Sequence, residues 1–220
     1  MQFKVSVILE SIIEFEETFS INEITFFKEG STKIAQVEVE ADYLSEAQSK
    51  AIIEFQSAFG AIALIAKHPI DFKIKSIIQL TPSDQFKMSI DQIAVSITVP
   101  KKLTREEVDL ATENHILIQE YPIIKDVFYL INSGNYNTWV TLYKVYEIID
   151  KDAGIKKNHW ITEANRNRFR RSANHPAVSG FDARHGYQKE KPPENPMALS
   201  EAKELIDNLV FQWLDYYKNK

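Results

Sequence analysis

The stretch at residues 165–188 contains the side chains of this chain that are best suited to chemistry. It holds five arginines and two of the five histidines, and four residues separate Arg170 from His175. A guanidinium group is a planar fork of donors that fits phosphate oxygens, and histidine exchanges protons near neutral pH. These are the groups that metal-free cleavage of a phosphodiester needs, namely a base, an acid and a cation that holds the phosphate.

Candidate roles can be assigned from residue type and spacing. The catalytic candidates are His175, Arg170 and His185. The candidates for phosphate or RNA binding are Arg166, Arg168, Arg171, Asn174 and Arg184. Offsets of three and four residues from Asn167 through Arg170 and Arg171 to Asn174 place these side chains on one face of a helix. The sequence therefore predicts a basic helix face that leads into a loop containing histidine.

Charge is distributed unevenly along the chain. The formal net charge is −5, yet residues 156–191 hold nine Lys or Arg side chains against three acidic ones. A basic island on an acidic protein creates a local potential that attracts anions. The same arrangement also fits a structural interpretation, in which the arginines attach the loop to the acidic part of the chain.

Residues 1–100 have the pattern of a β-rich domain with one helix. Apolar and polar residues alternate in several runs, as in half-buried strands. The alternating runs lie at residues 3–9, 35–41, 72–80 and 93–99, and a further apolar run lies at residues 21–27. Between them, Ser45 and Gln48 form a capping-box pattern, and a helical period follows until Pro69. We expect a largely antiparallel sheet of about five strands with one helix packed on it.

Residues 101–220 have a helical period throughout, so we place a domain boundary at residue 100 and expect an α+β protein with a C-terminal helical bundle. Thr104 and Glu107 form a second capping box, and Thr162 is a candidate cap for a helix that runs to Arg171. A basic Arg/His loop is expected within residues 165–196, and a last helix within residues 200–217. The aromatic residues Trp139, Tyr143 and Tyr146 are expected in the core.

A helical module with an Arg-x4-His spacing resembles the HEPN superfamily, many of whose members are metal-independent ribonucleases of bacterial defence, toxin–antitoxin and RNA-processing systems. The resemblance covers at most about residues 103–220. It implies that Arg170 and His175 are a catalytic pair with Asn174 or Arg171 beside them. It also implies a homodimer, because such sites usually form where two protomers pack.

Other functions remain open at the level of sequence. The loop could bind RNA or another phosphate-bearing ligand without cleaving it. In a non-enzymatic interaction protein it would instead dock an acidic partner, including the acidic half of another copy. His159, His175, Asp182 and His185 match no zinc-binding spacing, and no cofactor is expected. The chain has no cysteine and no apolar run of about 18 residues, which favours a cytoplasmic protein without a membrane span.

Overall fold

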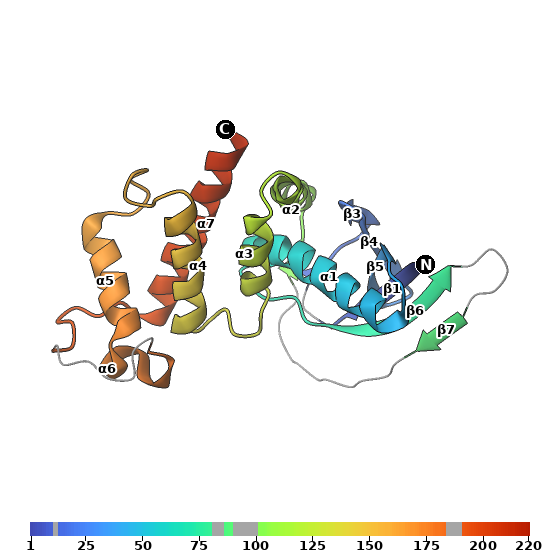
Figure 1. Ribbon diagram of the computed structural model, residues 1–220, viewed down its shortest axis with the longest axis horizontal. Coiled ribbons are helices and arrows are strands. Elements are labelled where there is room, and N and C mark those ends of the chain that lie inside the picture. Colours follow the sequence, from blue (N-terminus) through green and yellow to red (C-terminus); the bar gives the residue numbers. More distant parts are fainter. Residues whose placement is uncertain (11–12, 81–85, 90–100, 184–190) are drawn as a thin grey trace. The chain divides into compact units, whose positions relative to one another are not determined.

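The computed structural model describes residues 1–10, 13–80, 86–89, 101–183 and 191–220. They form two compact units, unit 1 at Met1–Ser133 and unit 2 at Gly134–Lys220 (Figure 1). Unit 1 combines a sheet with helices, and unit 2 is helical, so the chain belongs to the α+β class as expected. The predicted strand at residues 93–99 lies outside the described residues.

The sheet of unit 1 is antiparallel and has the strand order β3-β4-β5-β1-β6-β7. Its strands are β1 (Gln2–Leu9), β3 (Phe19–Ile21), β4 (Ile24–Glu29), β5 (Thr32–Glu40), β6 (Phe72–Leu80) and β7 (Phe86–Ser89). A separate parallel pair joins β2 (Ile13–Glu14) to β8 (Lys101–Lys102). Alternation along β1 buries Phe3, Val5, Val7 and Leu9, as the period of two predicts.

Helix α1 (Leu44–Ala66) packs on this sheet through aromatic side chains. Phe59 makes edge contacts with Phe26 and Phe72 and stacks on Phe55. By length and composition α1 could cross a membrane, and it is the one such helix in the described part of the chain. However, 56% of its apolar stretch is buried, as is typical of a core helix.

Helices α2 (Arg105–Ile116) and α3 (Ile123–Ile131) also belong to unit 1, and the 3-10 helix η1 (Leu117–Gln119) joins them. Both pack on α1. Asn132 links this region to two other parts of unit 1. Its side chain accepts from Ile70 N, in the segment before β6, at 2.7 Å and donates to Gln56 Oε1, on α1, at 2.7 Å. Because α2 and α3 belong to unit 1, the two units divide at residues 133 and 134, and not at residue 100 as we expected.

Of the two predicted capping boxes, one forms and the other does not. At α2 the side chain of Thr104 accepts from Glu107 N at 3.2 Å, and Glu107 accepts from Thr104 N at 3.1 Å, which confirms the predicted box. At α1 the N-cap is Tyr43, which makes no capping bond with its side chain. The predicted Ser45 box is wrong, and Glu46 instead accepts from Asp42 N at 2.9 Å.

Unit 2 is built on α4 (Trp139–Asp152), which contacts both α5 (Glu163–Asn174) and α7 (Leu199–Lys218). The expected aromatic core is confirmed, because Trp139, Tyr143 and Tyr146 are buried and surround the fully buried Phe169 of α5. The predicted loop after α5 contains two short elements, α6 (Pro176–Ser179) and the 3-10 helix η2 (Gly180–Asp182).

Candidate anion-binding site

Helix α5 presents one buried face and one polar face. Its first turn is capped by Thr162, whose hydroxyl accepts from Asn165 N at 3.3 Å. Phe169, Ser172 and Ala173 are buried on the side that faces the core. Because a helix repeats every 3.6 residues, burial of this side leaves the polar residues between Asn167 and Asn174 along the opposite side.

A surface pocket of about 200 Å³ lies on that polar side. It is lined by Asn167, Arg170, Arg171, Asn174, His175, Lys191 and Pro193. The structure thus brings together four of the residues predicted as a site, namely Arg170, Arg171, Asn174 and His175. The lining also includes Lys191, which lies in the segment before α7 and which was not among the predicted site residues.

The electrostatics of the pocket favour an anion. Of the lining side chains that the structure describes, three carry a formal positive charge and none carries a negative one. Among the described residues, no carboxylate lies within ion-pair distance of Arg170, Arg171 or Lys191. An incoming anion therefore meets cations that need not first be separated from an acidic partner.

His175 forms the corner between two helices. It ends α5 and begins α6, and its Nδ1 accepts from Ala177 N at 3.1 Å. Its side chain is buried, and Pro176 occupies the first turn of α6. This segment is therefore a helix end followed directly by the first turn of the next helix. Because Nδ1 accepts this hydrogen bond, Nε2 is the ring nitrogen that carries an N–H in this geometry.

Asn174 carries an unsatisfied group beside this corner. Its Oδ1 is buried and has no hydrogen-bond partner among the described residues. A buried acceptor without a donor costs about 1–3 kcal/mol. Unless a group outside the described residues pairs with it, the Oδ1 of Asn174 lowers the free energy of unfolding at the wall of this pocket.

Two predicted phosphate-binding arginines are engaged elsewhere in unit 2. The Nε of Arg166 donates to the Tyr146 hydroxyl at 2.9 Å, and its guanidinium lies 3.5 Å from Glu163. Burial raises the pKa of Tyr146 above its ordinary value, so this hydroxyl stays neutral. Arg166 does not line the pocket, contrary to our expectation.

Arg168 also lies outside the pocket lining. It donates to the backbone oxygens of Asn195 at 3.1 Å and Pro196 at 3.0 Å, and it forms an ion pair with Glu201. These bonds attach the segment before α7 to α5 within unit 2, whereas the structural interpretation had the arginines attach the loop to the acidic N-terminal part of the chain. The remaining candidates, Arg184 and His185, lie outside the described residues.

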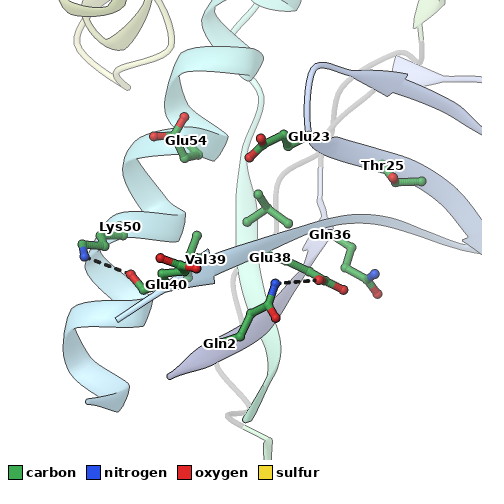
Figure 2. A pocket seen from close by; sticks show the side chains of 10 residues that line it. Gln2, Glu23, Thr25, Gln36, Glu38, Val39, Glu40, Lys50 and Glu54 are labelled. Carbon is green, nitrogen blue, oxygen red and sulfur yellow. Dashed lines mark hydrogen bonds between the residues drawn. The ribbon is translucent and has the colours of Figure 1, made fainter. Parts of the chain in front are cut away.

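A larger pocket of about 840 Å³ lies in unit 1 between α1 and strands β1, β4 and β5 (Figure 2). Four glutamates and one lysine are among its lining residues. Three of these five charges are engaged, since Glu54 pairs with Lys125 at 2.6 Å, Lys50 pairs with Glu46 at 2.8 Å and Glu38 pairs with Lys4 at 3.3 Å. Among the described residues, no group of three or more His, Asp or Glu side chains could hold a metal ion together.

A histidine and a serine also meet inside unit 1. His115 Nε2 lies 3.3 Å from Ser57 Oγ, and both residues are buried. His115 is only 4% exposed. Its Nδ1 has no hydrogen-bond partner in the described chain, so nothing orients the ring as a catalytic base requires. Burial lowers the pKa of His115 from 6.5 to about 4, so it is a neutral core residue.

Neither the family models, nor the curated proteins, nor the solved structures with which the chain was compared contain a match to it. The likeness to HEPN domains therefore depends on the Arg170–His175 spacing and on the helices around it. What this chain binds has to be argued from the α5 pocket, which is the one described pocket whose charged lining is entirely cationic.

Proposed function

We propose that this chain is a cytoplasmic RNA-binding module that holds the phosphate backbone in the α5 pocket. One observation carries the proposal: Arg170, Arg171 and Lys191 line a single pocket, and no carboxylate is among the lining residues that the structure describes. Clustered cations that lack acidic partners are the electrostatic footprint of a site for phosphate groups. Two asparagine side chains and His175 add further hydrogen-bonding groups to the same lining.

The strength of such binding follows from the number of cations involved. A single strand that has Z phosphates neutralised loses affinity with a logarithmic salt slope of about −0.7Z. Three cations therefore predict a slope of about −2 for the pocket. Loss of one hydrogen bond between charged groups costs about 1.5–3 kcal/mol, so each arginine should contribute at least about tenfold to affinity.

The test measures binding of a single-stranded RNA by fluorescence anisotropy across a range of salt concentrations. Arg170→Gln and Arg171→Gln should each weaken binding by at least about tenfold and reduce the salt slope by about 0.7. Lys156→Gln is the matched control, because it removes one exposed positive charge from unit 2 outside the pocket. Equal effects of all three variants would show that only net charge matters and would refute the proposal.

RNA cleavage is a second candidate function, favoured by the presence of Arg170 and His175 in one pocket. Cleavage without a metal needs both a base and an acid. Among the residues that the structure describes, His175 is the one histidine that lines the pocket, and its Nδ1 already accepts a hydrogen bond from Ala177 N. With Nδ1 engaged, this ring has at most one nitrogen for proton transfer, so the described lining supplies no more than one of the two groups that cleavage needs. Binding is therefore the better-supported function.

The experiment for cleavage incubates total RNA with the wild type and with His175→Asn, with and without EDTA. Asparagine retains an acceptor for the first turn of α6 but cannot transfer protons. Cleavage by this pocket should be insensitive to EDTA and lost in the variant. Cleavage that persists in His175→Asn would exclude the mechanism. A change in self-association without any change in RNA binding would instead indicate a protein-docking surface.

A further inference from the structure

The most exposed large hydrophobic side chain in the described chain is Phe181, whose relative exposure is 110%. It lies in η2, directly after α6. The ring therefore has neither face packed against the protein. Other aromatic residues of unit 2, such as Trp139, Tyr143 and Phe169, are buried together in the core. Hydrophobic burial within the free chain does not account for the placement of Phe181.

Phe181 lies close to the α5 pocket because α6 folds back on the end of α5. The hydroxyl of Ser179 donates to the backbone oxygens of both Ala173 and His175, at 3.1 Å in each case. Two peptide units separate Ser179 from Phe181, so their Cα atoms are at most about 7.6 Å apart. The ring therefore follows directly after α6, the short helix whose N-cap residue, His175, lines the pocket.

The turn itself is fixed by backbone geometry. Gly180 has a φ of 60° and a ψ of −135°, a conformation that residues with a Cβ rarely adopt. Ala183 N then donates to Gly180 O at 3.2 Å and closes the turn around Phe181. The exposed ring is thus carried by a defined turn.

We propose that Phe181 is a base-stacking residue and that the α5 pocket takes single-stranded RNA, with an unpaired base stacked on Phe181 beside the bound phosphate. This inference rests on the proposed function. A pocket of about 200 Å³ is smaller than the roughly 300–1,000 Å³ typical of sites for whole ligands, so it suits a phosphate group and leaves the base outside. Proteins that bind single strands combine cations for the backbone with aromatic rings for the bases.

The chemistry of stacking sets the specificity. Every base has a π-face, so an exposed ring selects unpaired bases without selecting sequence. In a duplex the bases are stacked on one another and the flat faces are not available to a side chain. Truncation of a stacking ring weakens binding by about 5- to 150-fold per base.

The probes are a short single-stranded RNA, the same RNA with abasic nucleotides, and its duplex. The wild type should bind the normal strand about 5- to 150-fold more tightly than the abasic strand. Phe181→Ala should abolish that difference without weakening binding to the abasic strand. Phe181→Trp should restore the difference, and its fluorescence should be quenched on binding. Tyr129→Ala is the control, because it removes a half-exposed ring from α3 in unit 1.

The outcomes separate this inference from the function on which it rests. If Arg171→Gln weakens binding but Phe181→Ala does not, stacking is refuted and phosphate binding stands. If Phe181→Ala weakens binding to the abasic strand as much as to the normal one, stacking is also refuted. If the arginine variants bind normally, both proposals fail. A Phe181→Ala variant that changes only the oligomeric state would assign the ring to a protein interface and overturn the inference.

Discussion

The buried histidine of unit 1 should make the stability of this unit depend on pH. His115 on α2 is 4% exposed and touches Ser57 on α1. Burial is the main cause that lowers its pKa from 6.5 to about 4, while the nearby charges of Glu54 and Lys125 act in opposite directions. A protonated ring would be a charge inside the helix interface, which is why the folded state resists protonation.

The sign follows from proton counting. Between pH 6.5 and pH 4 the unfolded chain binds a proton at His115 and the folded chain does not. Stability is therefore complete above pH 6.5 and falls as the pH drops towards 4, below which both states are protonated. At 1.36 kcal/mol per pKa unit, the full loss is about 3 kcal/mol.

The comparison that isolates this effect uses His115→Gln, which retains a hydrogen-bonding side chain but does not titrate. The free energy of unfolding of unit 1 can be followed by native-state hydrogen exchange of α1 and α2 amides between pH 4 and pH 7.5. The variant should lose about 3 kcal/mol less than the wild type over this range. His159→Asn, at an exposed position with a positive φ that asparagine tolerates, is the control. Equal slopes in wild type and His115→Gln would refute the reasoning.

Two further predictions concern packing and a buried hydrogen bond. A Cβ at Gly60 of α1 would lie 2.1 Å from the backbone oxygen of Phe128, so Gly60→Ala should destabilise unit 1 by about 1–3 kcal/mol despite the better helix propensity of alanine. Gly134→Ala, which has open space around it, is the matched control, and a gain of stability in Gly60→Ala, measured by urea denaturation followed by circular dichroism, would contradict the packing argument. In unit 2 the Tyr136 hydroxyl donates to buried Asp207 at 2.6 Å, so Tyr136→Phe should cost about 1.5–3 kcal/mol in urea denaturation followed by tryptophan fluorescence, and an unchanged midpoint would contradict it.

Local patterns predicted the elements of this fold but not which core each element joins. The alternation in β1 and the capping box at Thr104 depend on neighbouring residues alone, and the structure confirms them. The strand predicted at residues 72–80 also forms, but its burial does not alternate as expected. Membership of a core depends on long-range packing. Helices α2 and α3 have the same period as those of unit 2, yet they pack on α1, and this moves the boundary to residues 133 and 134.

For the candidate site, too, the local pattern was predicted and the long-range packing was not. Helical spacing was sufficient to place Arg170, Arg171 and Asn174 on one face, and His175 follows them directly at the pocket corner. The contribution of Lys191 could not be predicted, because it depends on how the segment before α7 returns to α5. The exposure of Phe181 was missed for a related reason: composition gives no sign that a single phenylalanine in a polar loop lacks a hydrophobic partner.

The four arginines of α5 differ in the bonds that they make, and this difference cannot be predicted from their spacing along the helix. Arg166 and Arg168 are satisfied by Tyr146, by Glu201 and by backbone oxygens that come from distant parts of unit 2. An anion could recruit them only by breaking those bonds, which would offset the energy it gained. Arg170 and Arg171 have no such bonds to lose among the described residues, so the same residue type on the same helix is structural at two positions and available at the other two.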